Sequence, residues 1–139
     1  MKYKIDFESN PKLEDTQLLC DGISEHAKSK KGHKPISFFA FFIRDENGKM
    51  VGGCNGDICY GCFFVGQLWV TEALRHQGYG TKLMTLAEDH ARLNHCPFMA
   101  VNTFDWEGLA FYKKLGFHVE FERHGFDKDS VFYFLRKNL

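Results

Sequence analysis

The pattern of apolar and polar positions along the chain predicts seven strands and three helices. Short apolar or alternating runs bounded by turn residues indicate strands; these are Tyr3–Phe7, Ile36–Ile43, a strand that begins at Met50–Gly53, Phe63–Val70, Phe98–Thr103, Phe117–Phe121 and Val131–Leu135. Apolar positions spaced three or four residues apart indicate helices; these run from Leu13 to about Lys28, from Gly80 to about Asn94, and from Trp106 to Leu115. This order predicts a mixed α/β (α+β) fold with helices on both faces of a mixed sheet.

Turn residues and helix-capping residues support these boundaries and a single domain. Asn47-Gly48 is a turn signal between two strands, Asp105 is placed to cap the third helix, and Gly116 is placed to end it. The chain contains no internal repeat, low-complexity tract or flexible linker, and 139 residues suffice for one core. We therefore expect one domain spanning residues 1–139.

Composition narrows the class of protein. The 18 basic and 18 acidic residues cancel, which argues against nucleic acid or an anionic membrane as a partner. No apolar run reaches the ~20 residues of a membrane span, and the first residues lack the apolar core of a signal peptide. Five cysteines are an odd number, so a complete disulfide framework within one chain is excluded. A reducing, cytoplasmic location is the simplest expectation.

One sequence feature indicates a binding site. Two glycines, Gly78 and Gly80, lie between a predicted strand and the next predicted helix, in the segment Arg75-His76-Gln77-Gly78-Tyr79-Gly80. A helix N-terminus leaves several backbone N–H groups without partners and carries partial positive charge, so it suits an anion. Glycines remove side chains that would stand between those groups and a phosphate. Neither a P-loop nor a Rossmann fingerprint fits this spacing.

Two segments together resemble the GNAT N-acetyltransferase family. Leu68-Trp69-Val70 followed by Arg75-x-x-Gly78-x-Gly80 and Leu83 is similar to the family's acyl-CoA-binding motif. Ala110-Phe111-Tyr112-Lys113-Lys114-Leu115-Gly116-Phe117 is similar to its FY-x-K-x-GF signature. Both lie in the family's order, and the predicted elements match its fold from end to end.

The resemblance implies a mostly antiparallel sheet in which the strands Phe63–Val70 and Phe98–Thr103 splay apart. Acetyl-CoA, as co-substrate, inserts between them beside the backbone of Leu68, Trp69 and Val70. Its pyrophosphate lies on the loop of Arg75, His76, Gln77, Gly78, Tyr79, Gly80 and Thr81. An amine attacks the thioester, a backbone N–H near Val70 stabilises the oxyanion, and Tyr112 is implied as the general acid.

Two positions depart from the family pattern. Asp105 stands where many members carry an asparagine that contacts the cofactor; it is either a cofactor contact or only a helix cap. Many family members carry a carboxylate near the end of the fourth strand that acts as the general base. This chain has Gly66 and Gln67 in that region. Glu72 and Glu107 are the nearby candidates for the general base; the alternatives are a water chain and an amine that arrives already neutral.

The sequence leaves three functions open. The first is an N-acyltransferase, with acetyl as the expected group and a small-molecule or peptide amine as acceptor. The second is a non-catalytic acyl-CoA-binding or regulatory module on the same fold. The third is a zinc or redox module built on Cys54, Cys59, Cys62 and Cys96, although a lone CxxC favours no bound metal. A homodimer that pairs through Val131–Leu135 is a further expectation.

Overall fold

The computed structural model describes residues 2–139 and divides into two compact units, Met1–Ile36 and Ser37–Leu139, each described here by itself. The expectation of a single domain stays a prediction. The N-terminal unit contains helix α1 (Leu13–Lys31), which begins where predicted and runs one turn further. Gly32 ends it in the left-handed conformation (φ 69°), with its N–H donating to the Lys28 carbonyl.

The predicted strand Tyr3–Phe7 is wrong. Residues 2–12 form no strand, and Tyr3, Ile5 and Phe7 are 83%, 98% and 90% exposed. Alternation of apolar side chains shows only that a segment has an apolar face. A strand also needs a partner for its backbone hydrogen bonds, and none of the described residues pairs with this segment.

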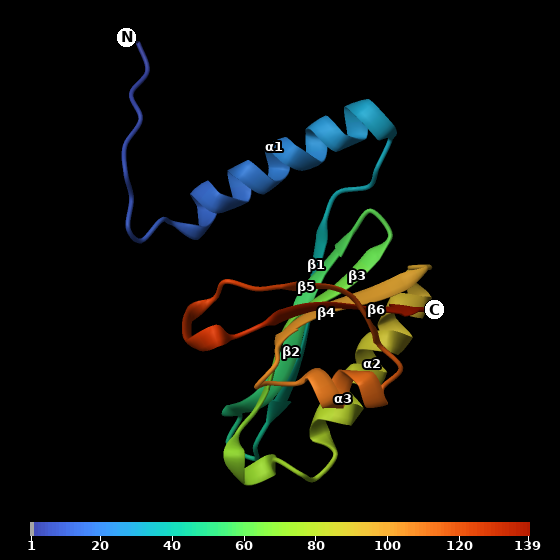
Figure 1. The fold of residues 1–139 in the computed structure, drawn as a ribbon. Helices are drawn as coiled ribbons and strands as arrows, with labels where there is room; N and C mark the ends of the chain where they lie inside the picture. Colours follow the sequence, from blue (N-terminus) through green and yellow to red (C-terminus); the bar gives the residue numbers. More distant parts are fainter. Residues whose placement is uncertain (1) are drawn as a thin grey trace. The chain divides into compact units, whose positions relative to one another are not determined.

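The second unit is built on one six-stranded sheet in the order β1-β2-β3-β4-β6-β5 (Figure 1). The strands are β1 (Ser37–Arg44), β2 (Met50–Cys59), β3 (Cys62–Val70), β4 (Phe98–Phe104), β5 (His118–Arg123) and β6 (Phe132–Asn138). Among the described residues β3 and β4 pair in parallel, and every other neighbouring pair is antiparallel. The mixed, mostly antiparallel sheet is confirmed.

Helix α2 (Tyr79–Leu93) connects the parallel strands and buries one face, formed by Leu83, Met84, Ala87 and Ala91, against the sheet. Fully buried Phe63, Met99 and Val101 lie on the same sheet face. This layer is the core of the unit. No helix of the described residues is long and apolar enough to cross a membrane.

Helix α3 (Leu109–Lys114) starts later than predicted, because Trp106 and Glu107 lie in turns before it. Its Phe111 ring lies next to Gly80 of α2, so both helices of this unit are on one sheet face. Whether helices cover both faces depends on α1 in the separate N-terminal unit, and stays a prediction.

The prediction that a homodimer pairs through the strand Val131–Leu135 is wrong. β6 pairs with β4 on one edge and β5 on the other, so its backbone has no open edge for a second chain. The edge strands of this sheet are β1 and β5.

Candidate active site

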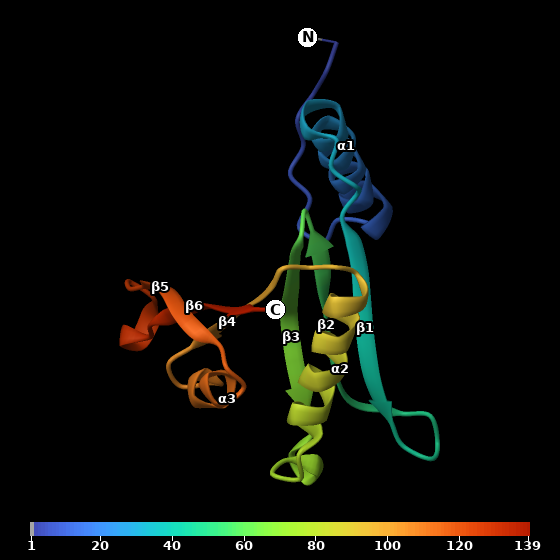
Figure 2. The same ribbon diagram turned by 90° about the vertical axis from the view of Figure 1, so that its right-hand side faces the viewer.

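The parallel pairing of β3 and β4 is short and then ends. It runs from Cys62–Phe98 to Val65–Val101 and goes no further. Beyond that point β4 and β6 turn away from the β1–β3 ladder (Figure 2). The predicted splay of these two strands is therefore present, and it opens at Gly66.

A β-bulge marks the place where the strands part. The β2–β3 register shifts between Asn55 and Gly56, so that Gly66 is an extra residue in β3. Gly56 is required there, since a Cβ on it would overlap the Phe64 carbonyl oxygen. The bulge thus redirects the rest of β3 at the mouth of the opening.

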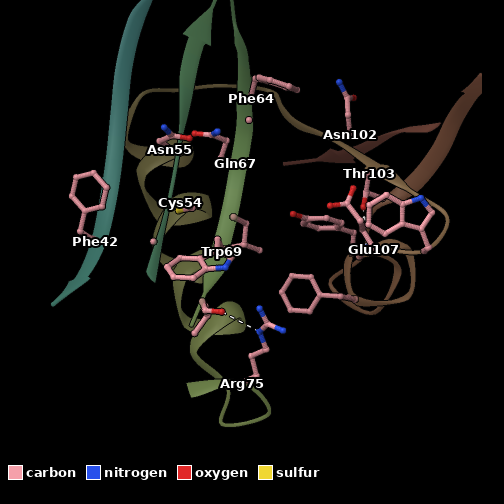
Figure 3. A pocket seen from close by; sticks show the side chains of 18 of the residues that line it. Phe42, Cys54, Asn55, Phe64, Gln67, Trp69, Arg75, Asn102, Thr103 and Glu107 are labelled. Carbon is pink, nitrogen blue, oxygen red and sulfur yellow. Dashed lines mark hydrogen bonds between the residues drawn. The ribbon is translucent and has the colours of Figure 1, made fainter. Parts of the chain in front are cut away.

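A cleft of about 930 Å³ fills the opening (Figure 3). Gln67 and Trp69 of β3 lie on one side, and Asn102, Thr103 and Glu107 lie on the other. Of the residues singled out from the sequence, the cleft is lined by Leu68, Trp69, Val70, Arg75, Glu107 and Tyr112. It is not lined by Glu72, His76, Gln77, Gly78, Tyr79, Gly80, Thr81 or Asp105.

The backbone of β3 faces the cleft at alternate residues. Thr71 donates its N–H to the Val51 carbonyl, and in this antiparallel register Trp69 also turns its backbone groups toward β2. Leu68 and Val70 therefore direct theirs toward the gap, where Arg75 Nε donates to the Val70 carbonyl at 3.1 Å. The Val70 N–H and both Leu68 groups are left to pair with a ligand in the cleft.

The loop after Arg75 ends in an unobstructed helix N-terminus. Gly78 is the N-cap residue of α2, in the left-handed conformation (φ 84°), and no side chain caps the helix. The first N–H groups, of Tyr79, Gly80 and Thr81, have no acceptor within the helix. No atom lies within 4 Å of the position that a Cβ on Gly78 would take, so an anion has open access.

Gly80 has a packing role that the sequence did not indicate, and its predicted role in ligand access stays a prediction. A Cβ on Gly80 would lie 3.3 Å from the tip of the Phe111 ring. The absence of a side chain therefore lets α3 approach α2. Since Phe111 belongs to the second sequence motif, the two motifs meet at this contact.

Tyr112 is a buried side chain of the cleft that carries a hydroxyl group. It is 8% exposed, and its ring packs edge-on against Phe117. Burial, with smaller contributions from the Cys54 thiol and the Glu107 carboxylate, raises the pKa of Tyr112 to about 12. The hydroxyl thus stays protonated at neutral pH and can act as a hydrogen-bond donor.

The structure gives different surroundings to the three acidic residues singled out from the sequence, Asp105, Glu107 and Glu72. Asp105 does not cap α3, which begins after Gly108 with no side-chain cap. Its N–H donates to the Val131 carbonyl and its carboxylate accepts from the Val131 N–H, so it ties the β4 end to the start of β6. Glu107 lies in the cleft with one oxygen on the Phe104 N–H, whereas Glu72 lies outside it.

The sequence missed several polar residues of the cleft. Asn55, Asn102 and Thr103 line it, as does Gln67, which had been noted only as a departure from the family. Asn102 and Thr103 end a predicted strand, and polar residues at such an end are the available signal. Thr103 Oγ1 accepts the Gly108 N–H and so orients the turn before α3.

The cysteines give no support to a metal site. Among residues 2–139 no three His, Cys, Asp or Glu side chains are grouped to hold a metal ion. Burial raises the pKa of the Cys54 thiol to about 11, and burial together with nearby Asp57 does the same for Cys62. Protonated thiols are poor ligands and poor nucleophiles.

Comparisons with known proteins agree with this geometry. Acetyltransferase Atu2258 of Agrobacterium fabrum is 35% identical over 75 residues, which are 54% of this chain and 55% of that protein. Blasticidin-S acetyltransferase of Streptomyces morookaense is 30% identical over 87 residues, which are 62% of this chain and 64% of that protein. The chain therefore matches less than two thirds of the length of these curated relatives.

A solved structure matches nearly the whole fold. A crystal structure from Agrobacterium tumefaciens, described as an acetyltransferase, superposes with a TM-score of 0.85 at 23% identity, covering 99% of this chain and 100% of that one. The family model described as acetyltransferase (GNAT) family matches residues 8–117. With both sequence motifs meeting at the split between β3 and β4, the chain belongs to the GNAT acetyltransferase family.

Proposed function

We propose that the protein is an N-acetyltransferase that moves acetyl from acetyl-CoA to a small-molecule amine. One observation carries the proposal: the open backbone edge of β3 lines the cleft together with Arg75, and the uncapped start of α2 follows three residues after Arg75 in the chain. An extended amide-bearing chain that ends in a diphosphate fits such a surface. The free N–H and C=O groups pair with the chain, and the helix start takes the anion.

The residues that would hold acetyl-CoA follow from this arrangement. Leu68 and Val70 offer backbone groups to the pantetheine arm, and Trp69 contributes an exposed ring at the cleft wall. The N–H groups of Tyr79, Gly80 and Thr81 offer a site for the pyrophosphate, next to Gly78. Bound there, acetyl-CoA supplies an activated thioester carbonyl. The side chains of Gln77 and Asp105 bond within the protein, to the Ala73 carbonyl and the Val131 N–H, so their contribution to the cofactor site would come from the backbone, and His76 stays a predicted contact.

The protein's own groups then act on the charges of the reaction. The Val70 N–H is the donor that we assign to the developing oxyanion. Tyr112 donates a hydrogen bond to the departing sulfur. We assign the general base to Glu107, since its carboxylate lines the cleft and Glu72 does not.

The name of one relative indicates the class of acceptor. Blasticidin-S acetyltransferase is named for a small-molecule substrate, which favours a small amine here over a peptide. We place the reaction in the cytoplasm. Five cysteines cannot all pair in disulfides within one chain, and in a reducing compartment cysteines stay as free thiols. A non-catalytic acyl-CoA-binding module is the second candidate, and the loss of the family's usual carboxylate on β3 favours it.

Calorimetry and a thiol-release assay test the proposal. Gly78→Glu places a negative side chain in the open space before α2, so we expect acetyl-CoA to bind at least about 10-fold more weakly, a loss of about 1.4 kcal/mol. Gly48→Glu is the matched control. Gly48 also has a positive φ (80°) and open space around it, but lies in the β1–β2 turn.

Undiminished affinity in a folded Gly78→Glu protein would refute the anion site. Tight acetyl-CoA binding without CoA release, across amines, polyamines, aminoglycosides and peptides, would instead support the non-catalytic candidate.

A further inference from the structure

A second hollow lies on the sheet face opposite α2. It has a volume of about 570 Å³ and is lined by residues of β1, β2 and β3. Side chains on this face form rows across the three strands. One row is Phe38, Asp57 and Phe64, and the next is Ala40, Asn55 and Gln67. The first row therefore has a carboxylate, Asp57, between two phenylalanine positions, and the second row has two neighbouring amide side chains, Asn55 and Gln67.

Asp57 has no counter-charge in the part of the chain that the structure describes. It is half-buried, and the ion pairs and side-chain hydrogen bonds found among residues 2–139 do not include it. Burial raises the pKa of its carboxyl group. A partly desolvated carboxylate without a partner is unfavourable, so the position is poised to gain from a cation.

The neighbours of Asp57 also suit a cation. Phe38 and Phe64 flank it directly on the adjacent strands. Aromatic faces attract ammonium groups, and the attraction grows when the cation is desolvated. Phe38 lines the hollow together with Asp57, whereas Phe64 lines the neighbouring cleft. A carboxylate beside an aromatic side chain favours a positively charged, partly apolar group over an anion or a neutral sugar.

The hollow is continuous with the cleft. Asn55, Gly66 and Gln67 line both, and Figure 3 shows Asn55 and Gln67 side by side at the boundary. Asp57 lies two residues from Asn55 on β2, which is about 7 Å along a strand. A molecule of modest length can thus reach from Asp57 to the opening between β3 and β4.

We propose that this hollow binds the acceptor and that Asp57 holds a second cationic group of it, so that the substrate class is a polyamine-like dication. The inference rests on the proposed function. The amine that reacts lies at the Asn55–Gln67 boundary and must be neutral to attack, while the distal group stays protonated against Asp57. Asp57 exchanges no proton in this role; it positions the substrate.

The test uses two amines of equal length, 1,5-diaminopentane and pentylamine. Binding is measured by calorimetry on CoA-saturated protein, where no transfer occurs, and kcat and KM are measured with acetyl-CoA. Asp57→Asn keeps the shape and removes the charge. Glu46→Gln, at an exposed position of the β1–β2 turn, removes one negative charge elsewhere and is the control.

We expect the parent to prefer the diamine. Asp57→Asn should raise Kd and KM for the diamine about 10-fold or more, leave kcat for the diamine within about threefold, and leave kcat/KM for pentylamine unchanged, because the reacting amine of pentylamine lies at the Asn55–Gln67 boundary and not at Asp57. Glu46→Gln should match the parent.

Equal kcat/KM values for the two amines with the parent protein overturn the inference. So does an Asp57→Asn protein that loses kcat for both amines, because that outcome makes Asp57 a base. If the diamine binds through Asp57 while no amine is acetylated, the cation site stands and the transferase function fails.

Discussion

At the scale of single residues, burial decides what Tyr112 can do. With its pKa raised to about 12, a full proton transfer to a thiolate of pKa ~8.5 is uphill by about 3.5 pKa units, or roughly 5 kcal/mol. Tyr112 therefore acts by donating a hydrogen bond to the sulfur as negative charge develops, and not as a strong acid. Its catalytic value depends on position and desolvation.

Tyr112→Phe should lower kcat about 100-fold and leave acetyl-CoA affinity nearly unchanged. The ring and its contact with Phe117 are kept, so the melting temperature at pH 7 should stay close to that of the parent. A kcat within about twofold of the parent would remove Tyr112 from the mechanism. The raised pKa gives a second readout. The folded state favours the protonated phenol, so the parent loses stability as pH rises from ~10 toward 12, a loss that the variant lacks.

Single residues also show where sequence reasoning stops. Gly78 is open to solvent as expected, but Gly80 is explained by Phe111, 31 positions along the chain. Asp105 has the right spacing for a cap and instead bonds Val131. Asp57 could not be singled out from the sequence, because the role of one aspartate in a strand depends on which residues lie beside it on the neighbouring strands. Each miss depends on a contact between distant segments.

At the scale of elements, the boundaries of strands and helices in the sheet unit follow closely from periodicity and turn residues. β3 and β4 were expected at Phe63–Val70 and Phe98–Thr103, and each is found within one residue. The splay itself came only from the family resemblance, since periodicity carries no information on where a ladder ends. The bulge could not be predicted, because an extra residue in one strand shows only when the register with its neighbour is known.

The bulge gives a matched pair of substitutions. Gly56→Ala forces a Cβ onto the Phe64 carbonyl, a backbone atom that can move only with the ladder. We expect a loss of about 3 kcal/mol in the free energy of unfolding, seen as a fall of roughly 10 °C in melting temperature. Gly66→Ala meets only the edge of the Phe64 ring at 3.4 Å, so it should cost less than about 1 kcal/mol. Equal melting temperatures for the two variants would contradict the assigned register.

At the scale of the whole molecule, charge and exposed aromatic area act against each other. The chain has 18 basic and 18 acidic residues, so its formal net charge at pH 7 is zero. Phe38, Phe42 and Trp69 on β1 and β3 are 64%, 54% and 51% exposed. Aromatic surface promotes association, and at zero net charge no long-range repulsion opposes it.

Self-association should therefore be strongest near neutral pH. Below its sequence pI of about 7.0 the protein carries a net positive charge, so at pH 5.5 copies of the molecule repel one another. Sedimentation velocity at about 100 µM should give a larger mean mass at pH 7 than at pH 5.5. Salt at 0.5 M screens the repulsion and should restore the larger mass at pH 5.5. An unchanged monomer mass under all three conditions would show that the exposed aromatic side chains do not drive association, and would remove the case for a homodimer through this face.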